Sequence, residues 1–282
     1  MNKKTAFQKI AAAPHIVWAI MFIVAPMIFV LYFAFTDAEG NFSFSNITSL
    51  SQYGNVFILS IAFALIATVV CLLIGYPLAY FMSLQKPRTQ KILMVLIMLP
   101  MWCNLLIRTY ALMALLDNGG LLNSLLENMG LDKVTIVGTN AGVILGMIYD
   151  FLPYMVLPIF TAMTKLNKQY IEASYDLGCN SFKTMTRVIM PLTASGVVSG
   201  ITMVFVPSIS TFYISQKLGV GKIDLVGDTI ERLFQNPSTY NVGAAISLVM
   251  MILILISIRI MNRFSGDDTG EEYGARGGVI KK

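Results

Sequence analysis

Six apolar stretches, each about 20 residues or longer, constrain this 282-residue chain more than any other feature. A helix needs roughly 20 apolar residues to cross a hydrocarbon core about 30 Å thick. The six stretches cover residues 15–35, 56–84, 92–116, 140–162, 192–214 and 242–261. We therefore expect an all-α integral membrane protein with six transmembrane helices.

The composition excludes the main alternatives. Hydrophobic residues make up 56% of the chain and charged residues 12%, whereas soluble domains carry about 25% charged residues. A soluble domain of this composition would expose large apolar patches, and a disordered chain needs the opposite bias. The three cysteines are isolated, which argues against a disulfide scaffold or a cysteine metal site.

The first stretch follows Lys3, Lys4 and Lys9, so a cleaved signal peptide is an alternative interpretation. Its apolar run is longer than the 7–15 residues typical of signal peptides, and no clear small-residue cleavage site follows. We predict an uncleaved first span. The expected organisation is a cytoplasmic tail over residues 1–14, a permease domain over 15–262 and a disordered cytoplasmic tail over 263–282.

The distribution of Lys and Arg predicts the orientation, because cytoplasmic loops are enriched in these residues. One side of the predicted topology carries 15 of the 20 basic residues, and the other side carries four. The remaining one, Arg108, falls inside a span. Both termini are therefore expected in the cytoplasm of a multi-pass plasma membrane protein. The basic residues form no aromatic-interleaved patch of the kind that binds nucleic acid.

Catalytic motifs are lacking in the sequence. His15 is the only histidine, and no zinc-protease, nucleophile-elbow or paired-cysteine signature occurs. The segment 219–222 (Gly-Val-Gly-Lys) lacks the remaining residues of a phosphate-binding loop. We expect no enzyme activity, no catalytic residue, no metal and no cofactor, and a partner would have to hydrolyse any ATP that is used.

The fourth loop, residues 164–191, is the most structured segment between spans. Asn167 is a plausible N-cap for a helix that ends near Gly178. A second helix is expected from Ser181, with residues 182, 185, 188 and 189 on one face and a break at Pro191. Two short helices meeting at a glycine would form a rigid corner; an amphipathic loop lying passively on the lipid is the alternative.

This loop resembles a known motif. Glu172, Ala173 and Ser174 are followed by Gly178 and, thirteen residues later, by Pro191. The pattern is similar to the E-A-A-x3-G loop of ABC importer permeases, with Ser174, Val188 and Met190 as conservative departures. The resemblance implies a coupling loop that docks into the ATPase subunit. The implied coupling residues are Glu172, Ala173, Ser174, Asp176, Gly178 and Pro191.

Two membrane segments extend the resemblance. Residues 100–110 resemble the P-x-W-x-N-x-L-I-R-x-Y segment of polyamine (spermidine/putrescine) permeases, and residues 149–158 are similar to their fourth-span segment. The similarity covers about residues 15–262 and is strongest to the first permease subunit. It implies a type I ABC importer permease fold in the bacterial inner membrane. The implied partners are a second permease, two ATP-binding subunits and an extracytoplasmic substrate-binding protein.

Two ionisable residues fall inside predicted spans, and such groups are candidates for function. Counting along continuous helices at 1.5 Å per residue places Arg108 roughly 24 Å and Asp150 roughly 15 Å from the ends at which their spans begin. Arg108 would then lie near the outer surface, where it either snorkels to water or has a gating or structural role. The difference in depth permits direct pairing with Asp150 only if the spans tilt.

Aromatic residues surround these positions. A carboxylate among aromatic faces suits a di- or polycation through charge pairing and cation–π attraction, although lipid-facing packing would also explain the aromatic residues. The predicted pathway residues are Trp102, Asn104, Tyr110, Tyr149, Asp150 and Tyr154.

Glycines spaced four apart, at 142 and 146 and at 196 and 200, predict close helix packing.

The sequence thus predicts a permease subunit of an ATP-driven importer, with polyamines as cargo. The alternatives are a permease for another small solute (an oxyanion, a metal ion or an amino-acid-like compound) and, in a different class, a membrane enzyme or a sensor subunit.

Overall fold

The computed structural model describes residues 14–37 and 39–264 and is helical over nearly all of them. Among these residues the only extended pairing is a bridge between Thr36 and Phe42. The predicted disordered tail and most of the predicted N-terminal tail lie outside the described residues.

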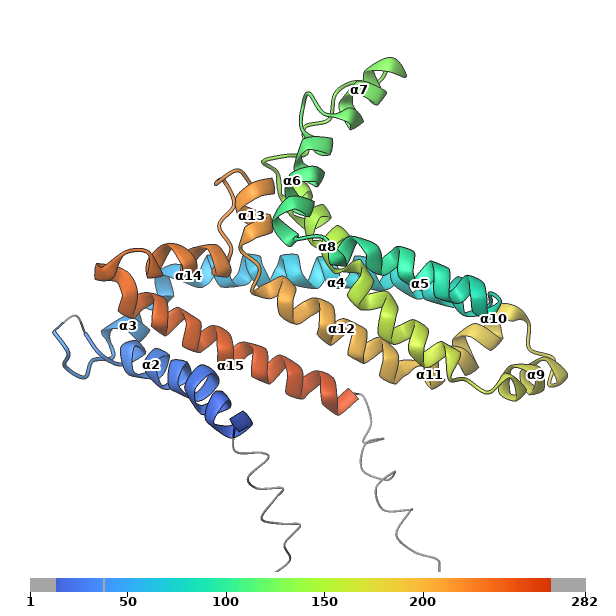
Figure 1. Ribbon diagram of the computed structural model, residues 1–282, viewed down its shortest axis with the longest axis horizontal. Helices are drawn as coiled ribbons and strands as arrows, with labels where there is room; N and C mark the ends of the chain where they lie inside the picture. Colours follow the sequence, from blue (N-terminus) through green and yellow to red (C-terminus); the bar gives the residue numbers. More distant parts are fainter. Residues whose placement is uncertain (1–13, 38, 265–282) are drawn as a thin grey trace, which may run out of the picture.

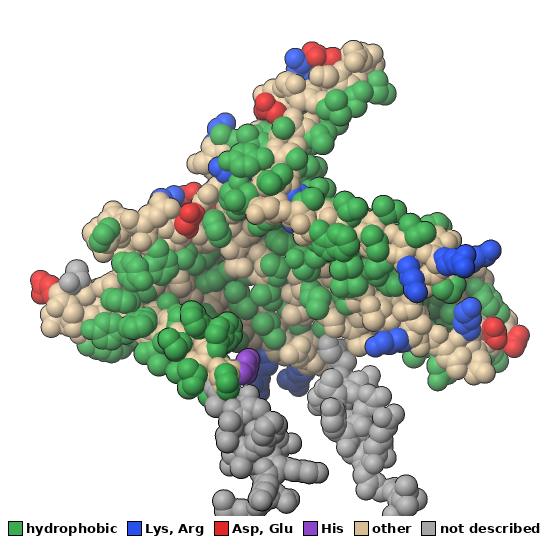
Figure 2. All heavy atoms as spheres, viewed as in Figure 1, with side chains coloured by type: hydrophobic (Ala, Val, Ile, Leu, Met, Phe, Trp, Pro, Cys, Tyr) green, Lys and Arg blue, Asp and Glu red, His purple; other side chains and the backbone are tan. Residues whose placement is uncertain are grey.

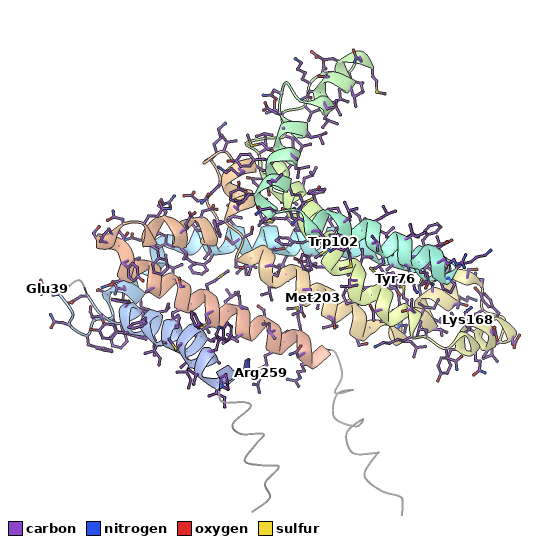
Figure 3. The ribbon with its side chains drawn as sticks, in the orientation of Figure 1. Glu39, Tyr76, Trp102, Lys168, Met203 and Arg259 are labelled. Atoms are coloured by element: carbon purple, nitrogen blue, oxygen red, sulfur yellow. The ribbon has the colours of Figure 1, made fainter. Side chains whose placement is uncertain are left out.

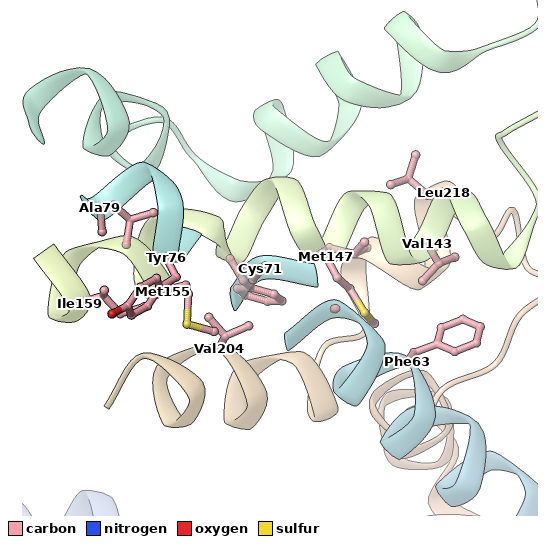
Figure 4. Close-up of a cluster of buried hydrophobic side chains, with 14 of the residues drawn as sticks. Phe63, Cys71, Tyr76, Ala79, Val143, Met147, Met155, Ile159, Val204 and Leu218 are labelled. Carbon is pink, nitrogen blue, oxygen red and sulfur yellow. The ribbon is translucent and has the colours of Figure 1, made fainter. Parts of the chain in front are cut away.

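Three long helices form the centre of the bundle (Figure 1). α4 (Gly54–Ser83), α8 (Asn140–Thr164) and α12 (Ala194–Ile209) pack against one another. Their contact buries Cys71, Met155 and Val204 (Figure 4). Glycines allow this close approach: a Cβ at Gly196 would lie 2.5 Å from that of Ala162. The prediction of close helix packing is confirmed at Gly146, Gly196 and Gly200, whereas Gly142 lies against Ile136 in the loop before its own helix.

A second group of helices covers one flank of this core. The first span, Pro14–Ala34, ends in α2 (Ala25–Ala34) and packs on α15 (Tyr240–Phe264). α14 (Val226–Phe234) runs back along α15. Short elements at this end are α3 (Ser45–Thr48) and two 3-10 turns, Ser49–Tyr53 and Pro237–Thr239.

The third predicted stretch is not one helix, which corrects the prediction of a continuous span over 92–116. α5 (Pro87–Trp102) ends, two extended residues follow, and α6 (Leu105–Leu116) begins in a new direction. Asn104 caps α6, its side chain accepting a hydrogen bond from the Leu106 N–H at 2.8 Å. With α7 (Leu121–Asn128) and α13 (Tyr213–Leu218), α6 forms a group that projects from the bundle (Figure 1).

The fifth predicted stretch, 192–214, is also shorter in the structure, because α12 ends at Ile209. Segments Ser181–Leu192 and Ala194–Ile209 meet at a bend of 68°. The break therefore falls at Thr193 and not at Pro191 as predicted. A π-helical turn, Met185–Ile189, precedes Pro191, just as another, Ile20–Val24, precedes Pro26. The wider turn accommodates a residue that cannot donate to the preceding turn.

Within the described residues, five helices are long and apolar enough to cross a membrane, or six if the bent pair counts as one span. The other four predicted stretches match the helices within three residues. Large apolar side chains are exposed along α2, α4, α5 and α15, as expected for surfaces that face lipid (Figure 2). The all-α, multi-span prediction is confirmed.

Candidate functional site

Arg108 and Asp150 form a buried ion pair between α6 and α8. The Arg108 Nε lies 2.5 Å from Asp150 Oδ1, and the side chains are 8% and 1% exposed. The N–H direction is poorly aligned with the carboxylate, so the contact is chiefly coulombic. Arg108 also donates to the Pro100 carbonyl at 3.2 Å, and the Thr109 hydroxyl lies 3.5 Å from Asp150 Oδ2.

This pair corrects two expectations. Arg108 does not snorkel to the surface. The difference in depth calculated for continuous helices does not keep Arg108 away from Asp150, because the third stretch breaks before α6. The break turns α6 so that its first turns lie against α8. The hydrogen bond from Arg108 to Pro100 spans the break and fixes the end of α5 to α6.

The four predicted aromatic pathway residues are exposed at the surface, and one of them, Tyr149, lies beside the ion pair. Trp102, the last residue of α5, is 72% exposed, and Tyr110, Tyr149 and Tyr154 are each more than a third exposed. Figure 3 places Trp102 near the middle of the molecule, far from Lys168, the first residue of α9 (Lys168–Asp176). The Tyr149 ring centre lies 6.0 Å from the Arg108 guanidinium carbon. These rings face outward from the chain, so a further surface is needed to close a pathway over them.

The structure adds two residues that sequence reasoning missed. Lys217 of α13 places its Nζ 5.0 Å from the Tyr110 ring centre and 5.6 Å from that of Tyr213. The two rings meet edge to face with centres 6.2 Å apart. Tyr213 and Lys217 are spaced by four residues, one helical turn, which the sequence displays. Nothing in the sequence indicated that Tyr110, about a hundred residues away, completes the group.

A second buried carboxylate, Asp228 of α14, also escaped sequence reasoning. Its Oδ2 accepts from the Ser215 hydroxyl at 2.6 Å and from the Leu225 N–H at 2.9 Å. Among the described residues no Lys or Arg forms an ion pair with it, and burial raises the pKa of Asp228 to about 6. The signal that could have found it is an acidic residue in the first turn of a short helix after Gly227, a position where a carboxylate satisfies free backbone N–H groups.

The fourth loop, residues 164–191, forms the corner that the sequence predicted. α9 (Lys168–Asp176) is capped by Asn167, whose side chain accepts from the Gln169 N–H at 3.0 Å. Gly178 has a φ of +79°, a left-handed conformation that favours glycine after a helix. Beyond it lie α10 (Ser181–Thr184), the π turn and α11 (Met190–Leu192).

Ser174, which departs from the alanine of the motif, holds the corner together. Its hydroxyl lies 2.9 Å from that of Thr184, and both side chains are buried. Glu172, Ala173 and Asp176 are exposed on α9. The predicted single apolar face of the second helix is wrong: Phe182 is exposed and Ile189 is buried, because the π turn changes the register between them.

Exposed apolar side chains and basic residues both gather at this corner. Leu177 and Phe182 are 85% and 75% exposed. Figure 2 shows Lys and Arg clustered at the end of the molecule that carries α9 and α10. A rigid corner with exposed apolar groups is suited to contact with another protein surface.

Comparison with known proteins identifies a family that this chain matches. Residues 75–266 match the family model described as binding-protein-dependent transport system inner membrane component. The chain is 36% identical over 267 residues to the spermidine/putrescine transport system permease protein PotB of Haemophilus influenzae, covering 91% of this chain and 93% of that protein. It is 33% identical over 258 residues to the PotB protein of Escherichia coli, covering 88% and 94%.

Solved structures agree in fold. A chain from the crystal structure of a bacterial ABC transporter involved in the import of the acidic polysaccharide alginate superposes with a TM-score of 0.75 at 20% identity, covering 93% of this chain and 96% of that one. A chain from the alginate transporter in complex with an alginate pentasaccharide-bound periplasmic protein gives 0.76 at 19% identity, covering 94% and 95%. At these identities the likeness shows the fold alone.

Proposed function

The chain belongs to the family of binding-protein-dependent transport system inner membrane components, and on this basis we propose that it is a permease subunit of an ATP-driven importer of polyamines such as spermidine and putrescine. It is a transport subunit and not an enzyme. The observation that carries the cargo assignment is the 36% identity, over nine-tenths of the chain, to a spermidine/putrescine permease.

The charge distribution around the Arg108–Asp150 pair supports a cationic cargo. An anion pathway would use the Arg108 guanidinium, but the Asp150 carboxylate neutralises it. The exposed tyrosine and tryptophan rings remain available, and their faces attract cations. We propose Trp102, Asn104, Tyr110, Tyr149, Asp150 and Tyr154 as pathway residues. A cargo ammonium would reach the Asp150 carboxylate only when its pair with Arg108 opens.

The coupling segment would transmit ATP-driven movement. In this proposal the ATPase contacts the exposed face of α9 around Glu172 and Asp176, and Gly178 and Pro191 shape the corner that carries the movement into α12. A cavity of about 320 Å³ lies between α9 and the turn from α4 to α5.

The proposed assembly contains a second, homologous permease, two ATP-binding subunits and an extracytoplasmic substrate-binding protein. The apolar flanks of α2, α5 and α15 would face membrane lipid. The concentration of basic residues at the α9–α10 end supports an orientation with that end, and both termini, in the bacterial cytoplasm.

Reconstitution into liposomes with these partner subunits tests the cargo. We expect ATP-dependent uptake of labelled spermidine and putrescine, with unlabelled polyamine competing and sulfate, divalent metal ions and amino acids not competing. Uptake of one of the latter solutes without polyamine uptake would contradict the proposal.

The coupling role is tested by Glu172→Lys, which reverses the charge at the proposed ATPase contact. We expect uptake to fall at least about tenfold, since a like-charge contact across an interface costs several kcal/mol, while membrane insertion is retained. The matched control is Glu127→Lys on α7, an exposed glutamate far from α9, which should transport normally. Normal uptake by the Glu172 variant would refute the docking assignment.

A further inference from the structure

The rings of Tyr110 and Tyr213 lie around the ammonium group of Lys217, an arrangement that would also bind a free cation. Tyr110 comes from α6, and Tyr213 and Lys217 come from α13, which packs on α6 and α8. The Nζ atom lies 5.0 Å and 5.6 Å from the two ring centres, within the roughly 6 Å over which a ring face attracts an ammonium group.

Among the described residues, Lys217 has no ion-pair partner, unlike two other basic side chains in this part of the fold. Lys133 pairs with Glu127 and Arg232 pairs with Asp224, but within the described residues no carboxylate lies within 4 Å of Lys217. The nearby Glu231 instead accepts a hydrogen bond from Gln216. Interaction with the Tyr110 side chain raises the pKa of Lys217, which favours its charged form.

The chemistry of this group matches the proposed cargo. A lysine side chain carries a primary ammonium on a flexible four-carbon stem. Putrescine has a primary ammonium at each end of a four-carbon chain, and spermidine has a four-carbon chain with a primary ammonium at one end and a secondary ammonium at the other. Rings that hold the Lys217 ammonium therefore present the geometry and electrostatics that a polyamine end group requires.

We propose that Tyr110 and Tyr213 form a primary-ammonium binding site that Lys217 occupies in the absence of cargo and that a cargo ammonium takes over by displacing it. This inference rests on the proposed function and deepens it. Tyr110 lies two residues after Arg108 and is 48% exposed, so the site is open to cargo and adjacent to the buried pair. The resident lysine acts as a tethered competitor, which lowers the apparent affinity for cargo.

Substitution of Lys217 tests this competition in the complete, reconstituted importer. Lys217→Met removes the charge and keeps the apolar stem. We expect the KM for putrescine to fall about three- to tenfold, as expected from removing a competitor held by two cation–π contacts. Lys217→Arg keeps a resident cation and should stay near the wild-type KM. The control Lys222→Met, on the same loop but outside the ring pair, should leave KM unchanged.

A double variant tests whether the two tyrosine rings form the binding site. Adding Tyr213→Leu to Lys217→Met should abolish the gain in affinity, because one of the two rings is then absent. An unchanged or raised KM in Lys217→Met, with the subunits assembled normally on a sizing column, would overturn the inference. An equal gain in the double variant would also overturn it.

Failure of the proposed function would look different, because the wild-type importer would then transport no polyamine. In that case equilibrium binding of labelled putrescine to the wild-type and Lys217→Met assemblies, without ATP, still decides the inference. Tighter binding by the variant supports the ring site, and equal binding refutes it.

Discussion

Asp150 and Asp228 are both buried aspartates, but the fold treats them in opposite ways. Asp150, on the long helix α8, is 1% exposed and lies against the guanidinium of Arg108. Asp228, at the start of the short helix α14, is 5% exposed and is surrounded by neutral donors, the Ser215 hydroxyl and the Leu225 N–H. The first carboxylate is compensated by a charge, and the second only by dipoles.

The difference lies in what each carboxylate holds together. The Arg108–Asp150 pair joins α6 to α8 beside a chain break, and both charges must be present for either to remain buried. Asp228 joins α13 to α14 through hydrogen bonds that either protonation state can accept. Asp150 is therefore suited to fixing a position, and Asp228 tolerates a change of charge.

The largest expected effect comes from breaking the ion pair. Arg108→Met leaves the Asp150 carboxylate buried without a cation, which costs about 3–5 kcal/mol of stability. Denaturant titration of the purified protein in detergent micelles measures the loss. The double variant Arg108→Met/Asp150→Leu should recover most of it, because neither charge remains. Wild-type stability of the single variant would show that the pair is not a structural element.

The second prediction concerns pH and Asp228. The pKa of Asp228 is raised to about 6, chiefly by burial, with Asp224 and Glu231 adding repulsion. A raised folded-state pKa means that the folded protein holds this proton more tightly than the unfolded chain. The resulting stabilisation is complete below about pH 4 and is lost as the pH rises to about 6, with a magnitude of about 2 kcal/mol.

Asp228→Asn removes this titration and keeps an acceptor oxygen. We expect the variant to gain stability relative to the wild type as the pH rises from 4 to 6, measured by thermal melting in detergent at each pH. A stability difference between variant and wild type that stays constant from pH 4 to pH 6 would contradict a raised pKa for Asp228. Asp37→Asn serves as the control, because Asp37 is a partly exposed aspartate in the first loop that accepts hydrogen bonds from backbone N–H groups of its own turn.

The smallest expected effect comes from removing one donor to Asp228. Ser215→Ala should cost about 1–2 kcal/mol, because it removes a buried hydrogen bond and leaves the carboxylate less satisfied. The control Ser210→Ala removes a hydroxyl that is exposed and bonds only to its own helix, so its cost should be within about 0.5 kcal/mol. Equal stability of the two variants would show that the hydrogen bond from Ser215 to Asp228 does not stabilise the fold.

The sequence specified the local features of this chain well. Four of the six apolar stretches match long helices to within three residues, because the thickness of the bilayer sets the length of a spanning helix. The cap at Asn167 and the left-handed residue Gly178 were predictable for a similar reason, since each depends on a few adjacent residues. The corner in residues 164–191 could therefore be located from the sequence, although the π turn before Pro191 changed the register of its second helix.

Only the tertiary structure decided which distant side chains meet. Depths calculated along straight helices placed Arg108 and Asp150 apart. In the structure the break after Trp102 turns α6, and the two side chains form an ion pair. The same turn brought Tyr110 to Lys217, and the packing of α13 on α14 buried Asp228. Spacing in the sequence defines the position of a residue within its own helix. The pairing of charges and rings depends on the angles between helices, which many weak packing contacts across the whole fold set together.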